Sequence, residues 1–223
     1  MIKWIVALKY RGDLPAEACR RYWMEQHAPM ALELTGLKGY RQSHRATGEE
    51  AFGNAPYDGF GSLWFEDEAA ARRALGSPQM AALRADAEQF ADPAGTRQLL
   101  AREVVMRDAA APEGALKLIT FNTRKPGLSP QAYQDYWENR HGQLVLRNFA
   151  ALGRYVQNHA LLSAYDAGAQ PDFDGILEAW LTSLEAFHAM GGTPESDAMR
   201  ADEAEFIDPA PFHFMLVRET VFG

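Results

Sequence analysis

The chain has 223 residues, and its 47% hydrophobic and 23% charged content is that of a globular protein rather than a disordered one. Its formal net charge of −8, without a basic run, argues against binding to nucleic acid or to an acidic membrane. The single cysteine excludes an internal disulfide, and the apolar run after Met1 is too short to span a bilayer and lacks a basic n-region. We therefore expect a cytoplasmic protein whose partner is a small molecule.

The first half of the chain alternates between a hydrophobic period of two and one of 3.6, which distinguishes strands from helices. Leu14-Pro15 suits a helix start, and the Asp58-Gly59 turn precedes an apolar strand. In chain order the pattern predicts a strand over 2–9, a helix that carries 22–27, strands over 40–44 and 59–65, a helix over 68–75, a helical turn over 86–90 and a strand over 98–106.

The second half repeats the first at an offset that grows from about 114 to about 116 residues. Tyr-Trp-x-x-x-His occurs at 22–27 and again at 136–141, and Tyr-x-Gln-x-His occurs at 40–44 and again at 155–159. Ser129 suits an N-cap, with proline at the first helical position. The other matching elements are predicted over 116–123, 175–181, 184–190, 202–206 and 212–221.

Each half thus has the order β-α-β-β-α-β of a ferredoxin-like motif, an antiparallel sheet with both helices on one face. The second face of such a sheet stays apolar and uncovered, so two copies in one chain can pack sheet against sheet. We predict an α+β protein with a first repeat over 1–106, a linker over 107–114 and a second repeat over 115–223. A homodimer is compatible with this arrangement but is not needed to complete it.

The order of these motifs resembles the EthD domain of the dimeric α/β-barrel superfamily. The resemblance rests on Tyr-Trp-x-x-x-His-Ala-Pro over 22–29, Tyr-x-Gln-x-His, the Asp-Gly turn and a terminal Asp-x-x-x-Phe-x-Asp, and it covers both halves. It implies a tandem EthD protein whose sheets form an intramolecular dimeric α/β barrel with a pocket between helices and sheet. Relatives in the superfamily act as cofactor-free cyclases, dehydratases, lyases or oxygenases on aromatic and polyketide-like molecules, and others bind haem.

Each repeat contains a set of candidate acid–base groups. Trp23 and His27 are four residues apart on a helix and share one face of it. Tyr40 and His44 share one face of a strand, because alternate residues of a strand point to the same side. Imidazole exchanges protons near neutral pH, and a phenol can donate to a developing oxyanion. A histidine beside a tryptophan can equally be a packing residue. The candidate catalytic residues are His27, His44, His141, His159, Tyr40 and Tyr155.

Neighbouring side chains are candidates for substrate contact. Asp86 and Asp202 lie in the third predicted helical segment of each repeat, where an aspartate can orient an imidazole. Helix capping or an ion pair with Arg84 or Arg200 is the alternative. The candidate substrate-binding residues are Tyr22, Trp23, Tyr136, Trp137, Arg140, Asp86 and Asp202.

The two copies differ beyond the shared histidine. The first has Ala28-Pro29 where the second has Gly142-Gln143, so we expect the halves to differ in function. Pro29 removes a helical hydrogen bond and predicts that the helix bends or ends just beyond His27. Such a bend could open a cleft, or it could be a simple helix terminus. The His-Ala-Pro of the EthD resemblance is intact only over 27–29, which slightly favours the first copy as the site.

The sequence predicts neither a metal nor another cofactor. It has no His-Glu-x-x-His pair, no cysteine pair, no Gly-x-Gly-x-x-Gly and no Walker motif. The leading hypothesis is therefore a cofactor-independent lyase-type enzyme that dehydrates, cyclises, decarboxylates or cleaves a small hydrophobic aromatic or polyketide-like substrate. The alternatives are a cofactor-free or haem-dependent monooxygenase and a non-catalytic small-molecule-binding module.

Overall fold

A computed structural model describes residues 1–110, 114–149, 152–209 and 212–222 of the chain. The strands in these ranges form a closed barrel in the order β1-β3-β2-β8-β5-β7-β6-β4, which confirms the predicted α+β barrel. The chain divides into two compact units: unit 1 is Met1–Arg45, Pro56–Arg102 and Glu219–Gly223, and unit 2 is Ala46–Ala55 and Glu103–Arg218. Residues 111–113 of the predicted linker lie outside the described ranges. Within those ranges, no helix has the length and apolar character needed to cross a bilayer.

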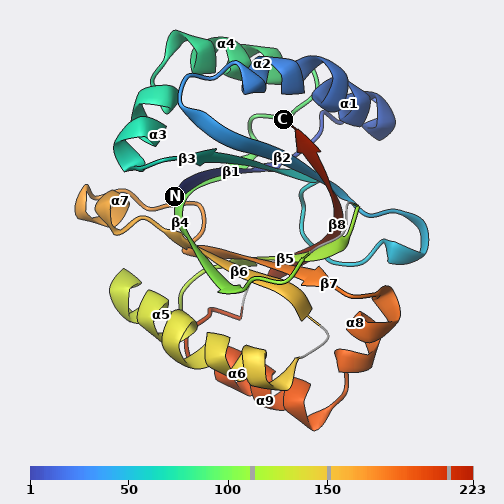
Figure 1. The fold of residues 1–223 in the computed structure, drawn as a ribbon, viewed down its shortest axis with the longest axis vertical. Helices are drawn as coiled ribbons and strands as arrows, with labels where there is room; N and C mark the ends of the chain where they lie inside the picture. The colour runs from blue at the N-terminus through green and yellow to red at the C-terminus, as the bar shows by residue number, and fades with distance from the viewer. Residues whose placement is uncertain (111–113, 150–151, 210–211, 223) are drawn as a thin grey trace. The chain divides into compact units, whose positions relative to one another are not determined.

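In unit 1, β1 lies between β3 and β4, and β2 pairs with the other edge of β3, all antiparallel. The helices lie on one face of this sheet (Figure 1). Ser77 caps the last of them, since its hydroxyl accepts from the N–H of Met80 at 3.1 Å. The elements are β1 (Ile2–Leu8), α1 (Ala16–Tyr22), η1 (Trp23–His27), α2 (Ala28–Leu32), β2 (Leu37–Arg45), β3 (Gly59–Phe65), α3 (Glu68–Leu75), α4 (Pro78–Ala87) and β4 (Arg97–Arg107).

Unit 2 repeats this arrangement, with β5 between β7 and β8 and with β6 on the other edge of β7. Ser129 is the predicted N-cap, and its hydroxyl accepts from the N–H of Ala132 at 3.1 Å. A short helix, η2 (Gly48–Glu50), also belongs to this unit although it lies in the sequence of the first repeat. The other elements are β5 (Leu116–Asn122), α5 (Pro130–Tyr136), η3 (Trp137–His141), α6 (Gly142–Asn148), β6 (Leu152–Ala160), α7 (Leu162–Asp166), β7 (Gly175–Leu181), α8 (Leu184–Met190), α9 (Pro194–Glu203) and β8 (His213–Phe222).

Two segments are longer than the sequence pattern predicted. The expected turns at 86–90 and 202–206 are the ends of full helices, α4 and α9, which begin eight residues earlier at Pro78 and Pro194. The apolar spacing in these helices is weak, so periodicity alone did not reveal them. Both begin with a serine or threonine cap followed by proline, and this signal does mark the start.

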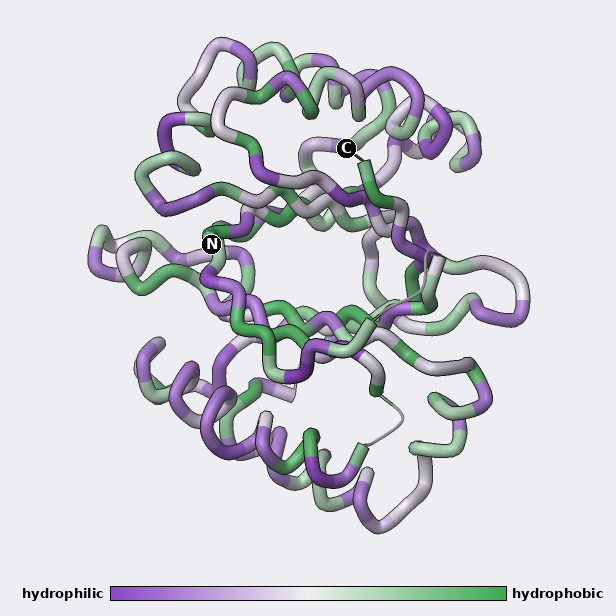
Figure 2. Tube along the Cα trace, viewed as in Figure 1, coloured by the Kyte–Doolittle hydropathy of each residue, from purple (hydrophilic) through white to green (hydrophobic). Residues whose placement is uncertain are grey.

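The core of unit 1 lies between its sheet and its helices. Hydrophobic and hydrophilic residues intermix along its helices, as the hydropathy colouring of the trace shows (Figure 2). Leu63 and Phe65 pack in one cluster with Ala28, Met80 and Leu83 from the helices. Burial of this helix-facing layer therefore positions α2 and α4 next to the sheet.

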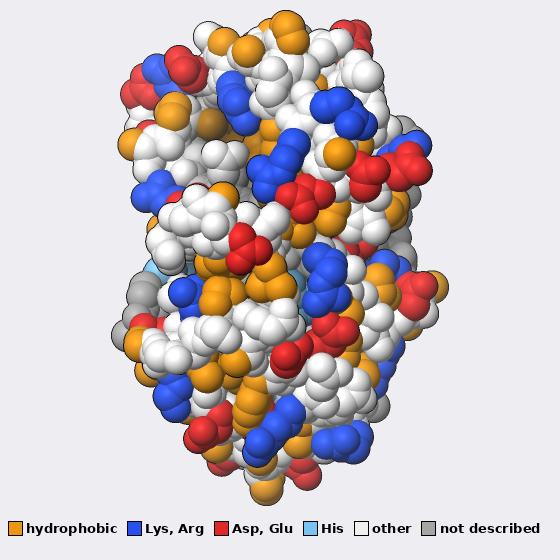
Figure 3. All heavy atoms as spheres, turned by 90° about the vertical axis from the view of Figure 1, so that its left-hand side faces the viewer, with side chains coloured by type: hydrophobic (Ala, Val, Ile, Leu, Met, Phe, Trp, Pro, Cys, Tyr) orange, Lys and Arg blue, Asp and Glu red, His pale blue; other side chains and the backbone are white. Residues whose placement is uncertain are grey.

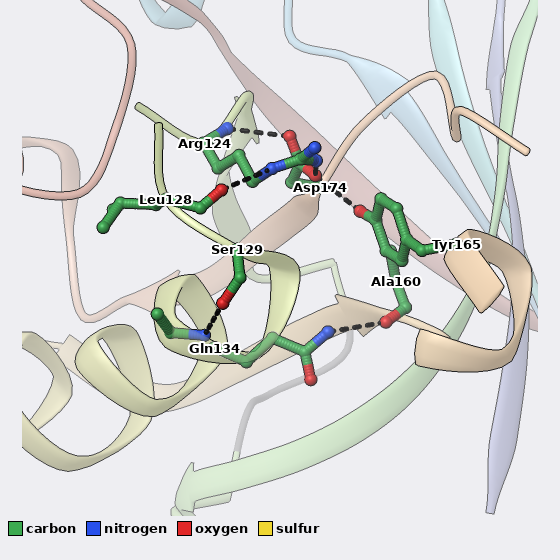
Figure 4. A network of polar contacts seen from close by, with 8 residues as sticks. Arg124, Leu128, Ser129, Gln134, Ala160, Tyr165 and Asp174 are labelled. Carbon is green, nitrogen blue, oxygen red and sulfur yellow. Dashed lines mark hydrogen bonds and ion pairs between the residues drawn. The ribbon is translucent and has the colours of Figure 1, made fainter. Parts of the chain in front are cut away.

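The Asp-Gly turns anchor the start of β3 and β7. In unit 1, Asp58 accepts from the N–H of Tyr10 at 2.9 Å. In unit 2, Asp174 accepts hydrogen bonds from the main chain and guanidinium of Arg124 and from the hydroxyl of Tyr165 (Figure 4). These aspartates are structural, in line with their interpretation as turn residues.

Candidate functional site

In both units the motif helix widens into a π turn at its tryptophan and histidine. The N–H of Ala28 donates to the carbonyl of Trp23, five residues back, and Gly142 makes the same bond to Trp137. The side-chain amide of Gln42 also donates to the Trp23 carbonyl, at 3.0 Å. Isolated π turns inside α-helices are frequent at functional sites.

The proline of the first copy is not the cause of this turn. The helix does not end beyond His27 but continues as α2 to Leu32. The second copy has Gln143 in place of proline and still has the π turn. Gln157 donates to the Trp137 carbonyl at 3.1 Å, as Gln42 does in unit 1. The shared feature is a strand glutamine that inserts into the helical hydrogen-bond ladder.

The π turn of unit 1 presents His27 to a carboxylate. The Nδ1 atom of His27 lies 2.7 Å from Oδ2 of Asp86, and the Tyr22 hydroxyl donates to Oδ1 of the same carboxylate at 2.8 Å. Burial lowers the pKa of His27, and the hydrogen bond and charge of Asp86 oppose that shift. A neutral imidazole whose Nδ1 proton faces the carboxylate keeps its lone pair on Nε2.

Unit 2 has the same triad. Nδ1 of His141 lies 2.8 Å from Oδ2 of Asp202, and the Tyr136 hydroxyl donates to Oδ1 of Asp202 at 2.9 Å. Burial again lowers the pKa of the histidine against the opposing effect of the aspartate. Both histidines are therefore set up as neutral bases at neutral pH.

Each histidine lines a cavity between the helices and the sheet of its own unit. The cavity of unit 1 has a volume of about 270 Å³, and that of unit 2 about 400 Å³. Both lie near the lower end of small-molecule sites, roughly 300–1,000 Å³. The unit 1 cavity is lined by His27, Trp23, Tyr40, Arg84 and Gln98 among others, and the unit 2 cavity by His141, Trp137, Tyr155, Arg200 and Glu203 among others.

A buried tyrosine stands beside each histidine in the cavity wall. The Tyr40 oxygen accepts from Trp23 Nε1 at 3.0 Å and from Gln42 Nε2 at 2.7 Å. Burial raises the pKa of Tyr40 to about 12, although these hydrogen bonds oppose the rise. The pKa of Tyr155 is raised to about 12 in the same way. Because its oxygen already accepts two bonds, each phenol has its own proton available for a ligand oxygen.

The candidate catalytic residues His44 and His159 are not among the residues that line the cavities. The ring of His44 lies 4.9 Å from the Trp23 ring, and burial lowers its pKa to about 3. His159 lies 4.8 Å from the Trp137 ring, with Nε2 at 3.0 Å from Gln157 Oε1. They do share a strand face with the tyrosines, but the intervening tryptophan ring packs on them.

Five of the candidate substrate-binding residues are not among those that line the two cavities. Tyr22 and Tyr136 are bonded to the triad carboxylates and are not among the cavity residues. The Arg140 side chain is 70% exposed, with its guanidinium over the Tyr136 ring and 3.7 Å from Asp202. Asp86 and Asp202 orient the histidines and do not line the cavities.

The sequence reading missed several cavity residues. Arg84 and Arg200 occupy the same place in the two repeats, 116 positions apart, and were considered only as partners of the aspartates. Glu203 stands where the unit 1 cavity has Ala87, and Phe52 reaches the unit 2 cavity from the sequence of the first repeat. A comparison of the two copies at cavity-facing positions is the signal that would have found them.

No group of three or more His, Cys, Asp or Glu side chains that could hold a metal ion occurs in the described part of the chain. On the face drawn in Figure 3, basic and acidic side chains are interspersed.

The EthD domain family matches residues 11–94 and 125–210, so the chain belongs to this family and contains its domain twice. Among curated proteins, none matches the chain significantly in sequence. The fold is shared with an anthrone oxidase-like protein, at 9% identity and a TM-score of 0.68 over 100% of this chain and 93% of that one. It is also shared with a chlorite dismutase from Candidatus Nitrospira defluvii, at 12% identity and a TM-score of 0.56 over 98% and 90%. A third is a provisionally named monooxygenase from Lactobacillus acidophilus, at 9% identity and a TM-score of 0.57 over 99% and 94%.

Proposed function

We propose that the cavities are acid–base sites for a small, hydrophobic, oxygenated aromatic or polyketide-like substrate, and that the reaction is a cofactor-independent lyase-type reaction. One observation carries the proposal: in each unit a neutral histidine, held at Nδ1 by a carboxylate 2.7 or 2.8 Å away, lines an apolar cavity. A histidine held in this way has one tautomer and one orientation, which a general base requires.

The proposed step is removal of a proton by Nε2 of His27 or His141. The acidic position is a carbon next to a carbonyl, or a phenol. As negative charge develops on the substrate oxygen, the hydroxyl of Tyr40 or Tyr155 donates a hydrogen bond to it, a contact worth on the order of 3 kcal/mol in a dry site. Dehydration, cyclisation, decarboxylation and retro-aldol cleavage all use such a stabilised enolate or phenolate.

The arginine in each cavity suits an anionic group of the substrate. Arg84 lies over the Trp4 ring, 6.0 Å from its centre, and Arg200 lies 3.3 Å from the Ser196 hydroxyl. A guanidinium binds carboxylates and enolates through paired N–H groups. A β-keto acid or an aromatic acid is therefore a suitable substrate class to test first.

The test compares the wild type with His27→Asn and His141→Asn on a panel of aromatic acids, phenols and polyketide-like lactones. Ligand binding is followed by the shift in melting temperature, and products by mass spectrometry. Turnover lost in one or both histidine variants, but kept in the exposed neighbour Glu25→Gln, supports the proposal. Turnover unchanged in the double variant His27→Asn/His141→Asn contradicts it.

Oxygen chemistry is a second candidate function. Proteins of this fold include ones named as anthrone oxidase-like and as monooxygenases, although at 9% identity they share only the fold. The same proton removal would give a carbanion, which in some substrates transfers an electron to dioxygen and then forms a carbon–oxygen bond with it. Product formation under strict exclusion of oxygen favours the lyase-type reaction. Consumption of oxygen in proportion to the product formed favours the oxygenase reaction.

The histidine of each cavity suits haem as an axial ligand, but the cavity volume does not suit a haem group. A neutral imidazole whose Nδ1–H is held by a carboxylate is a suitable axial ligand. Cavities of about 270 and 400 Å³ suit a smaller ligand than a haem macrocycle. A Soret band in the purified protein would contradict this conclusion.

A non-catalytic module that binds a small molecule is the alternative to an enzyme. It predicts that a panel compound binds to the wild type and to both histidine variants with no product in any of them. Binding that depends on His27 or His141 together with turnover excludes it.

A further inference from the structure

The two cavities differ in the position and burial of their acidic side chain. Glu203 is the last residue of α9 and lines the unit 2 cavity together with His141. The matching position of the first repeat, 116 residues earlier, is Ala87, which lines the unit 1 cavity. The unit 1 cavity has its own acidic lining residue, Glu88, but that residue is exposed, whereas Glu203 is partly buried.

The surroundings of Glu203 favour its protonated form. Phe187, Met190 and Met199 line the same cavity, and burial raises the pKa of the carboxyl to about 7, with Arg200 opposing and Asp202 adding to the rise. Such an acid is a proton donor near neutral pH. The helices packed against it carry further charged and titratable groups. These are Glu138, Arg140 and His141 on η3, Arg147 on α6, and Glu195, Asp197, Arg200 and Asp202 on α9 itself.

The unit 2 cavity is also the more aromatic of the two. Phe52 comes from the segment 46–55 and lies 5.6 Å from the Phe187 ring and 5.5 Å from the Phe214 ring. The main chain of this segment holds it in place, since Leu216 donates to the Phe52 carbonyl at 3.0 Å. The five phenylalanines of the cavity are Phe52, Phe149, Phe187, Phe212 and Phe214.

These differences identify a substrate class for one site. We propose that the unit 2 cavity eliminates water from aromatic β-hydroxyketones, with His141 as the base and Glu203 as the acid that protonates the leaving hydroxyl. The inference rests on the proposed function, because it requires His141 to remove the first proton.

The step balances without a further reagent. Nε2 of His141 takes a proton from the carbon between the carbonyl and the carbinol, and the electron pair forms an enolate. The enolate then forms the carbon–carbon double bond as the carbon–oxygen bond breaks, and Glu203 gives its proton to the departing hydroxide. The products are a conjugated enone and water, and proton transfer from the imidazolium to the carboxylate restores both groups.

The aldol adduct of benzaldehyde and acetone is the probe, because its dehydration creates a conjugated enone that absorbs in the near ultraviolet. Glu203→Gln keeps the shape and removes the transferable proton, so the rate should fall roughly 10²-fold. The exposed neighbour Glu205→Gln should keep the wild-type rate. Melting temperatures measured in parallel show that the variants are folded.

The pH profile is the readout that a structural role would not change. Since the acid must be protonated, the wild-type rate should fall as the pH rises above about 7, and Glu203→Gln should lose that alkaline limb. Wild-type rate and profile in Glu203→Gln, with activity lost in His141→Asn, would overturn the role of Glu203 and leave the proposed function intact. No turnover of this probe by the wild type, while another compound is converted through His141, would also overturn the inference.

Discussion

The side-chain amide of Gln42 lies 3.0 Å from the carbonyl oxygen of Trp23, an oxygen that a regular α-helix would pair with the N–H of His27. The same amide donates to the Tyr40 hydroxyl at 2.7 Å. One strand residue thus holds the π turn, the cavity tyrosine and, through the turn, the histidine.

Replacing this amide should loosen the site. Gln42 is fully buried, so Gln42→Met keeps the volume but removes donors to Trp23 and Tyr40, and the free energy of unfolding should fall by about 1–3 kcal/mol. Urea denaturation measures the change. Gln79→Met, on an exposed helix position, should stay within about 0.5 kcal/mol of the wild type. Equal changes in the free energy of unfolding for the two variants would contradict the role of Gln42 in stabilising the π turn and Tyr40.

The aspartate of the triad should control the titration of its histidine. Asp86→Asn removes the interaction that raises the pKa of His27 and leaves the burial that lowers it, so that pKa should fall further. Proton NMR of the His27 ring during a pH titration measures it. Asp13→Asn, a change at an exposed carboxylate, is the control, and an unchanged His27 titration in Asp86→Asn would contradict the triad.

Burial of His44 should make the protein sensitive to acid. Its folded pKa of about 3 lies below the unfolded value of 6.5, so the folded state binds fewer protons and loses stability as the pH falls below 6.5. The loss should reach about 3 kcal/mol at pH 4 by the linkage relation. Urea unfolding at several pH values should show that the gap between wild type and His44→Gln narrows by this amount on acidification. A constant gap would mean that His44 titrates normally.

Glu203 should have the opposite linkage. Its folded pKa of about 7 lies above the unfolded value of 4.5, so the carboxyl contributes stability at low pH that is lost as the pH rises from 4.5 through 7. Relative to the wild type, Glu203→Gln should gain about 2–3 kcal/mol of stability between pH 4 and pH 8. Thermal unfolding across this range measures it, with Glu205→Gln expected to show no such trend.

The buried ion pair of unit 2 predicts a stability effect away from the cavities. Lys117 Nζ lies 2.7 Å from Glu178 Oε2, and the two side chains are 0% and 1% exposed. Glu178→Leu leaves a buried ammonium without this carboxylate and should cost about 3–5 kcal/mol. The double variant Lys117→Met/Glu178→Leu should recover most of the loss. Failure of the double variant to recover would show that packing, not the unpaired charge, sets the cost.

The repeated motifs allowed the fold and half of each site to be predicted. Two hydrophobic periods and the recurrence of Tyr-Trp-x-x-x-His gave the β-α-β-β-α-β order, because these are local properties of the chain. Helical spacing placed Trp23 and His27 on one face. The idea that Asp86 orients an imidazole matches the observed contact with His27, and repetition at Asp202 and His141 supported it.

Long-range packing decided the rest. Alternation along a strand put Tyr40 and His44 on one face, but only the position of the Trp23 ring determined that the tyrosine reaches the cavity and the histidine does not. Pro29 suggested that the helix bends or ends beyond His27. The structure has a helix that continues to Leu32, with a π turn that is held by a contact with Gln42 on a distant strand.

The sequence by itself determined the repeat, the order of elements and the candidate histidines, since hydrophobic period and motif spacing are written along the chain. Only the tertiary structure decided which side chains share a cavity, as with Phe52 and Glu203, which are 151 positions apart in the sequence and line the same cavity. The physical reason is that a cavity is the space left between elements that pack by their apolar faces. This packing brings together residues that are far apart along the chain, and their sequence positions do not predict that they meet.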